Sequence, residues 1–190
     1  MDIKNFEKFL ASVNEDIEKI FNHQQEFIFC KEGCSLCCER GDYPLSELEF
    51  KYMMIAYDKL DENIKSIIKA NAQKVKQGNK ESYTCPFLIE HKCSIYSHRP
   101  FVCRTFGVLT EDSKGNPCYP FCATQGKNYS EFYDAEKNCL SSSAYYKKNY
   151  LSYPKFFRLS NKVIMNLPLA KELDIDFGES RIMIDFLELE

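Results

Sequence analysis

Four cysteines stand within nine residues of this chain, and three more follow on short segments further along. Together they are Cys30, Cys34, Cys37, Cys38, Cys85, Cys93 and Cys103. Thiolates are soft ligands, and clusters of thiols like these are typical of zinc sites and of iron–sulfur clusters. To use them together, the chain has to fold so that loops distant in the sequence lie side by side. The sequence therefore predicts a metal site with these seven cysteines as its candidate ligands.

The spacing within the first group limits how the ligands are shared. Cys34 and Cys37 form a C-x-x-C pair, whose two intervening residues let both sulfurs turn toward one ion. Cys38 follows directly, and the side chains of neighbouring residues diverge. Cys37 and Cys38 are therefore not expected to be equivalent ligands of one tetrahedral ion. Three interpretations stay open: a cluster of several irons, two adjacent metals, or one ligand beside a bystander.

The remaining cysteines, Cys118, Cys122 and Cys139, carry a weaker signal. Free cysteines are often small, buried, hydrophobic residues. That explanation suits Cys139, which we expect on the core face of a helix. Cys118 and Cys122 are separated by three residues, and they are either buried thiols of the same kind or the beginning of a second site.

Several basic residues lie next to the candidate ligands in the sequence. The positive charges of Lys92, Arg99 and Arg104 would offset an anionic thiolate site and lower the pKa values of its thiols. His91 and His98 could also ligate a metal. Each occurs in a polar turn, however, where a solvated loop histidine is the better explanation.

The composition narrows the class of protein. The 190 residues are 44% hydrophobic and 28% charged, which is ordinary for one globular domain over residues 1–190. A net charge of -3 predicts no nucleic-acid partner, and no apolar run approaches the ~18 residues of a membrane span. The polar, acidic start is not a signal peptide, so we expect a cytoplasmic location. Clustered cysteines there are more typical of ligands than of disulfides, and an exported, disulfide-bonded protein is the alternative.

Apolar residues at helical spacing predict a mostly α fold. Between residues 3 and 28 they recur every three or four positions, which predicts an amphipathic helix that leads into the first cysteine group. Ser46 with Glu49 forms a capping box at the start of a helix that continues to about Leu60. A further helix is expected over residues 61–78, where a glycine ends it.

The second half of the chain is harder to interpret. Pro100 is expected in the first turn of a short helix that carries Cys103. Residues 130–150 are predicted to form another helix. The apolar runs at 155–166 and 181–189 fit either a helix or a strand. The fold we expect is an irregular helical domain whose cysteine-rich loops converge on a metal site.

Four short motifs resemble one known family. They are Cys34-x-x-Cys37-Cys38, Cys85-Pro86-Phe87-Leu88, Cys93-Ser94-Ile95-Tyr96 and Arg99-Pro100-Phe101-Val102-Cys103-Arg104. In order and spacing they resemble the YkgJ-type cysteine-cluster family, also called the CxxCxxCC zinc- or iron-chelating domain, over residues 30–107. The resemblance implies metal binding by the shared cysteines. Cys30 precedes Cys34 by four positions, where the family name implies three, so it follows the other six as a candidate ligand.

These observations predict an intracellular metal-binding protein that holds an iron–sulfur cluster of the 4Fe-4S type, with zinc as the alternative. The same segment is similar to flagellin lysine N-methylase, which uses an iron–sulfur cluster and S-adenosylmethionine. The resemblance therefore implies a second hypothesis, an S-adenosylmethionine-dependent methyltransferase acting on lysine in a protein substrate. A structural zinc domain or a metal-delivery module is the third. Whether the chain is an enzyme stays open at this point.

Overall fold

The computed structural model describes residues 3–31, 33–78, 82–112, 114–131, 133–141 and 154–188. Its α-helices are α1 (Ile3–His23), α2 (Leu36–Glu39), α3 (Glu47–Asp58), α4 (Glu62–Gln77), α5 (Phe101–Thr105), α7 (Asn161–Met165), α8 (Pro168–Glu172) and α9 (Met183–Phe186). Short 3₁₀ helices are η1 (Gln25–Phe27), η2 (Tyr96–His98) and η3 (Phe121–Gln125). The strands pair two by two: β1 (Pro44–Ser46) with β8 (Ser180–Ile182), β2 (Leu88–Ile89) with β3 (Lys92–Cys93), β4 (Thr110–Glu111) with β5 (Pro117–Cys118), and β6 (Tyr133–Asp134) with β7 (Cys139–Leu140). The prediction of a mainly helical protein is confirmed.

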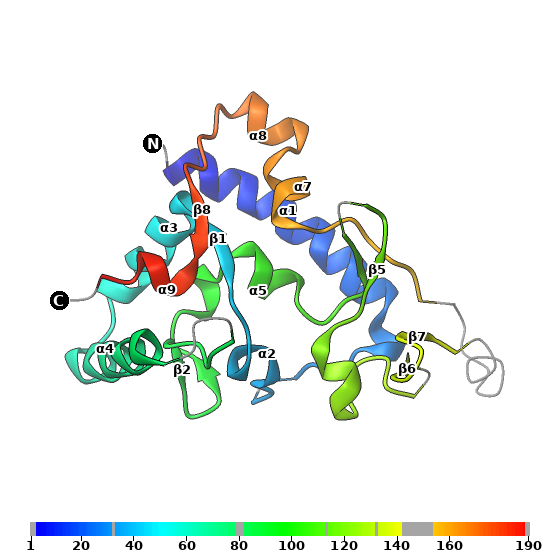
Figure 1. The fold of residues 1–190 in the computed structure, drawn as a ribbon. Helices are drawn as coiled ribbons and strands as arrows, with labels where there is room; N and C mark the ends of the chain where they lie inside the picture. Colours follow the sequence, from blue (N-terminus) through cyan, green and yellow to red (C-terminus); the bar gives the residue numbers. More distant parts are fainter. Residues whose placement is uncertain are drawn as a thin grey trace.

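The long helix α1 covers one side of the molecule (Figure 1). It buries Phe6, Phe9, Leu10, Val13 and Ile17, the spacing that the periodicity predicted. These residues pack against Phe101 of α5, Leu48 of α3 and Phe177. Burial of so many large apolar side chains stabilises the packing of α1 against α5 strongly. This packing fixes the position of α5. Within the described ranges, no helix has both the length and the apolar composition needed to cross a membrane.

A second core lies between α3, α4 and α9. The capping box at the start of α3 is present as predicted: Ser46 Oγ accepts a hydrogen bond from the Glu49 N–H at 3.2 Å, and Glu49 Oε2 accepts one from the Ser46 N–H at 2.8 Å. The helix predicted over residues 61–78 is α4, which begins at Glu62. The buried members of this core include Met53, Ile68, Phe87, Ile95, Met183, Ile184 and Leu187.

The C-terminal segment returns to the first half of the chain. Strand β8 pairs antiparallel with β1, so that Pro44 lies opposite Ile182 and Ser46 opposite Ser180. The sequence left the tail undecided between helix and strand, and the structure contains both, since β8 runs directly into α9. Figure 1 shows α9 on the same side of the molecule as the start of α1.

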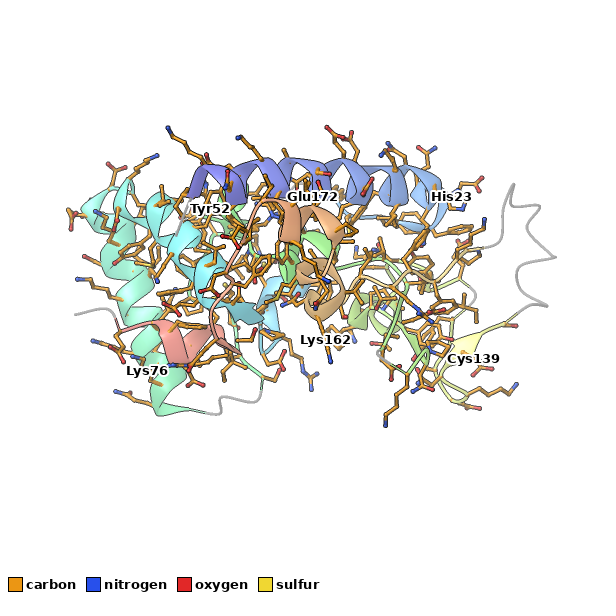
Figure 2. The ribbon with its side chains drawn as sticks, turned by 90° about the horizontal axis from the view of Figure 1, so that it is seen from above. His23, Tyr52, Lys76, Cys139, Lys162 and Glu172 are labelled. Carbon is orange, nitrogen blue, oxygen red and sulfur yellow. The ribbon has the colours of Figure 1, made fainter. Side chains whose placement is uncertain are left out.

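The helix predicted over residues 130–150 is wrong in its described part. The β6–β7 hairpin occupies residues 133–140, and residues 142–150 lie outside the described residues. Asp134 Oδ1 accepts hydrogen bonds from the N–H groups of Glu136 and Lys137 at 3.1 Å each, and this local bonding favours a turn over a helix. Cys139 consequently lies in a hairpin at the end of the molecule where α1 ends at His23 (Figure 2).

Candidate metal centre

The backbone after the first cysteine group pairs with the backbone before Cys85. Gly41 and Tyr83 exchange N–H···O hydrogen bonds of 3.2 and 3.0 Å, and the N–H of Cys85 donates to the carbonyl of Cys38 at 2.7 Å. A side chain at position 41 would force the ring of Tyr43 to shift, since a Cβ there would lie 2.8 Å from it. Cys38 and Cys85 are thus neighbours, although they are far apart in the sequence.

The β2–β3 hairpin then brings Cys93 to the same place. Its turn residues Glu90 and His91 have φ angles of 48° and 62°, the left-handed conformation of a tight hairpin turn. The register places Cys93 opposite Leu88, and the N–H of Leu88 donates to the carbonyl of Cys85 at 3.0 Å. The hairpin therefore returns the chain toward Cys85 at Cys93.

Cys103 comes from α5, as predicted for a short helix that follows Pro100. The helix is fixed in the interior because Phe101 is fully buried beneath α1. A small cavity of about 40 Å³ lies beside Cys103, and its wall also includes Cys37 and Tyr43. We call the five cysteines whose charges act on one another's pKa values the five-cysteine group: Cys37, Cys38, Cys85, Cys93 and Cys103.

The thiols of the five-cysteine group influence one another. Burial raises the pKa of Cys85 to about 12 and that of Cys103 well above its usual range, and negative charge on the neighbouring sulfurs raises both further. Cys37 Sγ and Cys38 Sγ are 3.9 Å apart; their hydrogen bond lowers the pKa of Cys37 to about 7 and raises that of Cys38. A metal-free group of this kind retains most of its protons, and a bound cation is needed to hold it as thiolates.

Backbone N–H groups support the charged form of two of these sulfurs. The N–H groups of Phe87 and Leu88 act on Cys85 and oppose the effect of burial on its pKa. The N–H of Ile95 acts on Cys93 in the same direction. Hydrogen bonds of this kind favour a thiolate over a thiol, so the loops are already arranged for ligands that carry negative charge.

Arg99 faces the same thiols. Its guanidinium lies over the ring of Tyr96, 3.6 Å from the ring centroid, and its charge lowers the pKa values of Cys37, Cys93 and Cys103. Arg99 Nε is buried without a hydrogen-bond partner in the described structure. An unpaired buried N–H costs free energy, and an anionic sulfur beside it would remove that cost.

A thiophilic metal fits this donor set by its chemistry. All ten cysteines, each in a described segment, are free thiols, so the disulfide-bonded alternative gains no support. Across the parts of the chain that the structure describes, no three His, Cys, Asp or Glu side chains already stand where they would hold one ion. The fit therefore depends on the five neighbouring sulfurs, the N–H groups directed at them and the unpaired Arg99 Nε.

Two of the predicted ligands, Cys30 and Cys34, are not part of the five-cysteine group. Cys30 Sγ accepts a hydrogen bond of 3.3 Å from Asn128 Nδ2. Burial raises the pKa of Cys122 to about 11, and the charges of Cys30 and Cys34 raise it further, so these three thiols lie near one another. Sequence spacing had associated Cys122 with Cys118. Cys118 instead belongs to β5, and its sulfur is directed at its own hairpin.

His91 and His98, the two histidines considered as ligands, both contact side chains outside the five-cysteine group. The His91 side chain is 73% exposed, in line with a loop histidine, and its Nδ1 is 2.9 Å from Ser35 Oγ. Ser35 Oγ also donates to Glu39 Oε1 at 2.5 Å, so Ser35 links the first cysteine loop to the β2–β3 turn. The imidazole of His98 stacks on Tyr52 with ring centroids 4.4 Å apart.

The fold defines a helical domain in which backbone pairing joins loops that are distant in the sequence and that each carry free thiols. The family model described as "Putative zinc- or iron-chelating domain" (CxxCxxCC) matches residues 29–140, and the chain belongs to this family. The match extends beyond the predicted segment 30–107 and includes the three later cysteines. No curated protein and no solved structure matches the chain. The relation to flagellin lysine N-methylase stays a prediction.

Proposed function

We propose that the five-cysteine group holds an iron–sulfur cluster and that binding this cluster is the function of the domain. The observation that carries the proposal is the combination of five neighbouring thiols with the unpaired buried N–H of Arg99. One tetrahedral ion takes only about four protein ligands, so five thiols exceed what it needs. Hydrogen-bond donors and positive charge around the sulfurs suit the inorganic sulfides of a cluster.

The parts played by the chain follow from the same contacts. The backbone bond between Cys85 and Cys38 and the β2–β3 hairpin hold the ligand loops together. Arg99 offsets the negative charge of the thiolates, and Cys103 is half-buried in the wall of the small cavity. A bound cluster supplies a centre that accepts and releases single electrons. Thiolate ligands persist under reducing conditions, which supports a cytoplasmic location.

Zinc is the second candidate, and the size of the cavity favours it. The space of about 40 Å³ beside Cys37 and Cys103 has room for a single ion without rearrangement of the loops. Zinc bound by four thiolates would have a structural role, because such sites contribute directly to folding. Elemental analysis distinguishes the iron–sulfur cluster from zinc.

The experiment is anaerobic purification followed by iron, acid-labile sulfide and zinc analysis. Iron and sulfide together, with visible absorption, are the expected result. Colourless protein with stoichiometric zinc would replace the cluster by zinc, and metal-free protein that takes up neither would refute both. Cys85→Ser and Cys103→Ser should lose the metal. Cys139→Ser is the matched control, since Cys139 lies on the separate β6–β7 hairpin, and it should keep the full content.

A further inference from the structure

Residues 91–110 contain no aspartate and no glutamate, although acidic residues outnumber basic ones in the whole chain, 28 against 25. The segment contains Lys92, Arg99 and Arg104 instead. It includes η2 and α5, and it carries two members of the five-cysteine group. A basic region in a protein with a net charge of -3 is a candidate surface for a partner of opposite charge.

Arg104 holds this region together. Its Nη2 donates to the carbonyl of Ser97 at 2.7 Å, and its Nε donates to the carbonyl of Arg99 at 2.7 Å. Its Nη1 donates to Asn14 Oδ1 on α1 at 3.1 Å. These acceptors are neutral, and among the described residues the guanidinium makes no ion pair. The charge of Glu49, which is buried, also acts on Arg104. The hydrogen bonds therefore fix η2 against α1 and leave positive charge beside it.

Tyr96 is the exposed part of the same region. The residue is 63% exposed, more than Phe29 at 53%. The guanidinium of Arg99 lies 3.6 Å from the centroid of the Tyr96 ring and holds the ring in one orientation. An ordered side chain loses little conformational entropy on binding, and Tyr and Arg are enriched among the residues that carry most of the binding energy of interfaces. Tyr96 is therefore suited to anchor a partner.

Helix α3 adds to this surface. The imidazole of His98 stacks on Tyr52 of α3, with ring centroids 4.4 Å apart. Lys59 follows Tyr52 by two helical turns, so it lies on the same side of the helix, and it is exposed. Glu7 of α1 limits the positive charge here, since its charge acts on His98 together with that of Lys59. We call the following five residues the basic surface: Lys59, Tyr96, His98, Arg99 and Arg104.

We propose that the basic surface docks an acidic segment of a partner protein, which places an apolar side chain on Tyr96 and its carboxylates around it. The positive charge attracts and orients such a segment, and the exposed ring supplies the apolar contact. A nucleic acid is the other polyanion that a basic surface could bind. Glu7 beside His98 and the acidic balance of the whole chain disfavour it, because a phosphate backbone would extend beyond this surface. The proposal does not depend on which metal the five-cysteine group holds.

The first test uses calorimetric titration with a soluble synthetic peptide of glutamate and glycine that has a single central leucine. Wild-type protein should bind this peptide, and Tyr96→Ala should lower the affinity about tenfold, as expected for an anchor residue. Lys59→Glu should also lower it. Phe29→Ala and Lys127→Glu are the matched controls, because they change an exposed ring and an exposed lysine in the wall of a separate pocket, and they should bind like wild type. Absence of binding to wild type, or equal losses in Tyr96→Ala and Phe29→Ala, would overturn the proposal.

The second test uses the wild-type chain, so that misfolding of a variant cannot affect it. Added salt should weaken binding of the acidic peptide, because ions screen exposed charges. The same peptide with lysine in place of glutamate should not bind. Amide chemical shifts of isotope-labelled protein should change at Tyr96, His98 and Lys59 when the acidic peptide is added, and the amide of Lys127 should stay unchanged. Shifts centred elsewhere, or tighter binding of single-stranded oligothymidylate than of the acidic peptide, would refute the proposal.

Discussion

The buried carboxylate of Glu49 accepts a hydrogen bond of 2.7 Å from the backbone N–H of Phe101. Its other oxygen accepts hydrogen bonds from the N–H and Oγ of Ser46, each at 2.8 Å. A single side chain therefore closes the capping box of α3 and satisfies the first N–H of α5. Because α5 carries Cys103, the position of one proposed ligand depends on this carboxylate.

We expect Glu49→Gln to destabilise the protein by about 1–3 kcal/mol, the cost of leaving buried donors unpaired. The amide of the introduced glutamine has only one acceptor oxygen. Its NH₂ group would therefore face either the N–H of Phe101 or Ser46, which also donate. Urea unfolding of metal-free protein measures the change in the free energy of unfolding, and zinc competition should show weaker binding. Glu47→Gln is the control: Glu47 pairs with Lys51 at the surface, and its loss should cost below about 1 kcal/mol. Equal effects of the two changes would contradict the role of Glu49.

Arg99→Gln should weaken metal binding. The change removes the positive charge that lowers the pKa values of Cys37, Cys93 and Cys103, so these thiols hold their protons more tightly. If a cluster is bound, its reduction potential should become more negative, because a nearby cation stabilises the reduced form. Arg99→Lys should retain part of the effect. Arg158→Gln is the control, since Arg158 lies in an exposed pair with Glu111, and it should change neither quantity. Wild-type affinity in Arg99→Gln would refute the role of the guanidinium.

Ser35→Ala should loosen the contact between the two cysteine loops. It removes the hydrogen bonds of the buried Ser35 hydroxyl to His91 and Glu39, and we expect a loss of about 1 kcal/mol in unfolding free energy. Metal affinity should fall with it, as competition with a chelator would show. Ser97→Ala is a matched control because Ser97 Oγ also lies 2.9 Å from a histidine Nδ1 but is exposed. Equal metal affinity in both variants would argue against Ser35 as a link.

Metal-free protein should lose stability at alkaline pH. The folded chain holds the Cys85 proton up to about pH 12, whereas an ordinary cysteine releases it near pH 9.0, so folded protein binds more protons between these values. The free energy of unfolding therefore falls as pH rises from 9 toward 12. Cys37, with its pKa lowered to about 7, acts oppositely between pH 7 and 9. Urea unfolding across this range should show a maximum near pH 9 that metal-loaded protein lacks. A flat profile for the metal-free protein would contradict the thiol environment described.

Local features were predictable because their causes are local. The spacing of Phe6, Phe9 and Val13 predicts α1, and Ser46 with Glu49 predicts the start of α3, since side chains three or four residues apart meet on a helix. The error at residues 130–150 has a local cause as well. Apolar residues there suggested a helix, but the side chain of Asp134 binds the backbone of the next residues and favours a hairpin.

The sequence by itself determined that the chain is mainly helical, that it carries a pool of thiols suited to a soft metal, and where its principal helices begin. The grouping of those thiols was decided only by the tertiary structure. Cys85 meets Cys38 through backbone pairing at Gly41 and Tyr83, and Cys30 accepts a hydrogen bond from Asn128. These contacts join residues far apart in the chain, and their formation depends on packing of the whole domain. No spacing between cysteines encodes them, which is why Cys122 was associated with Cys118 until its neighbours were seen.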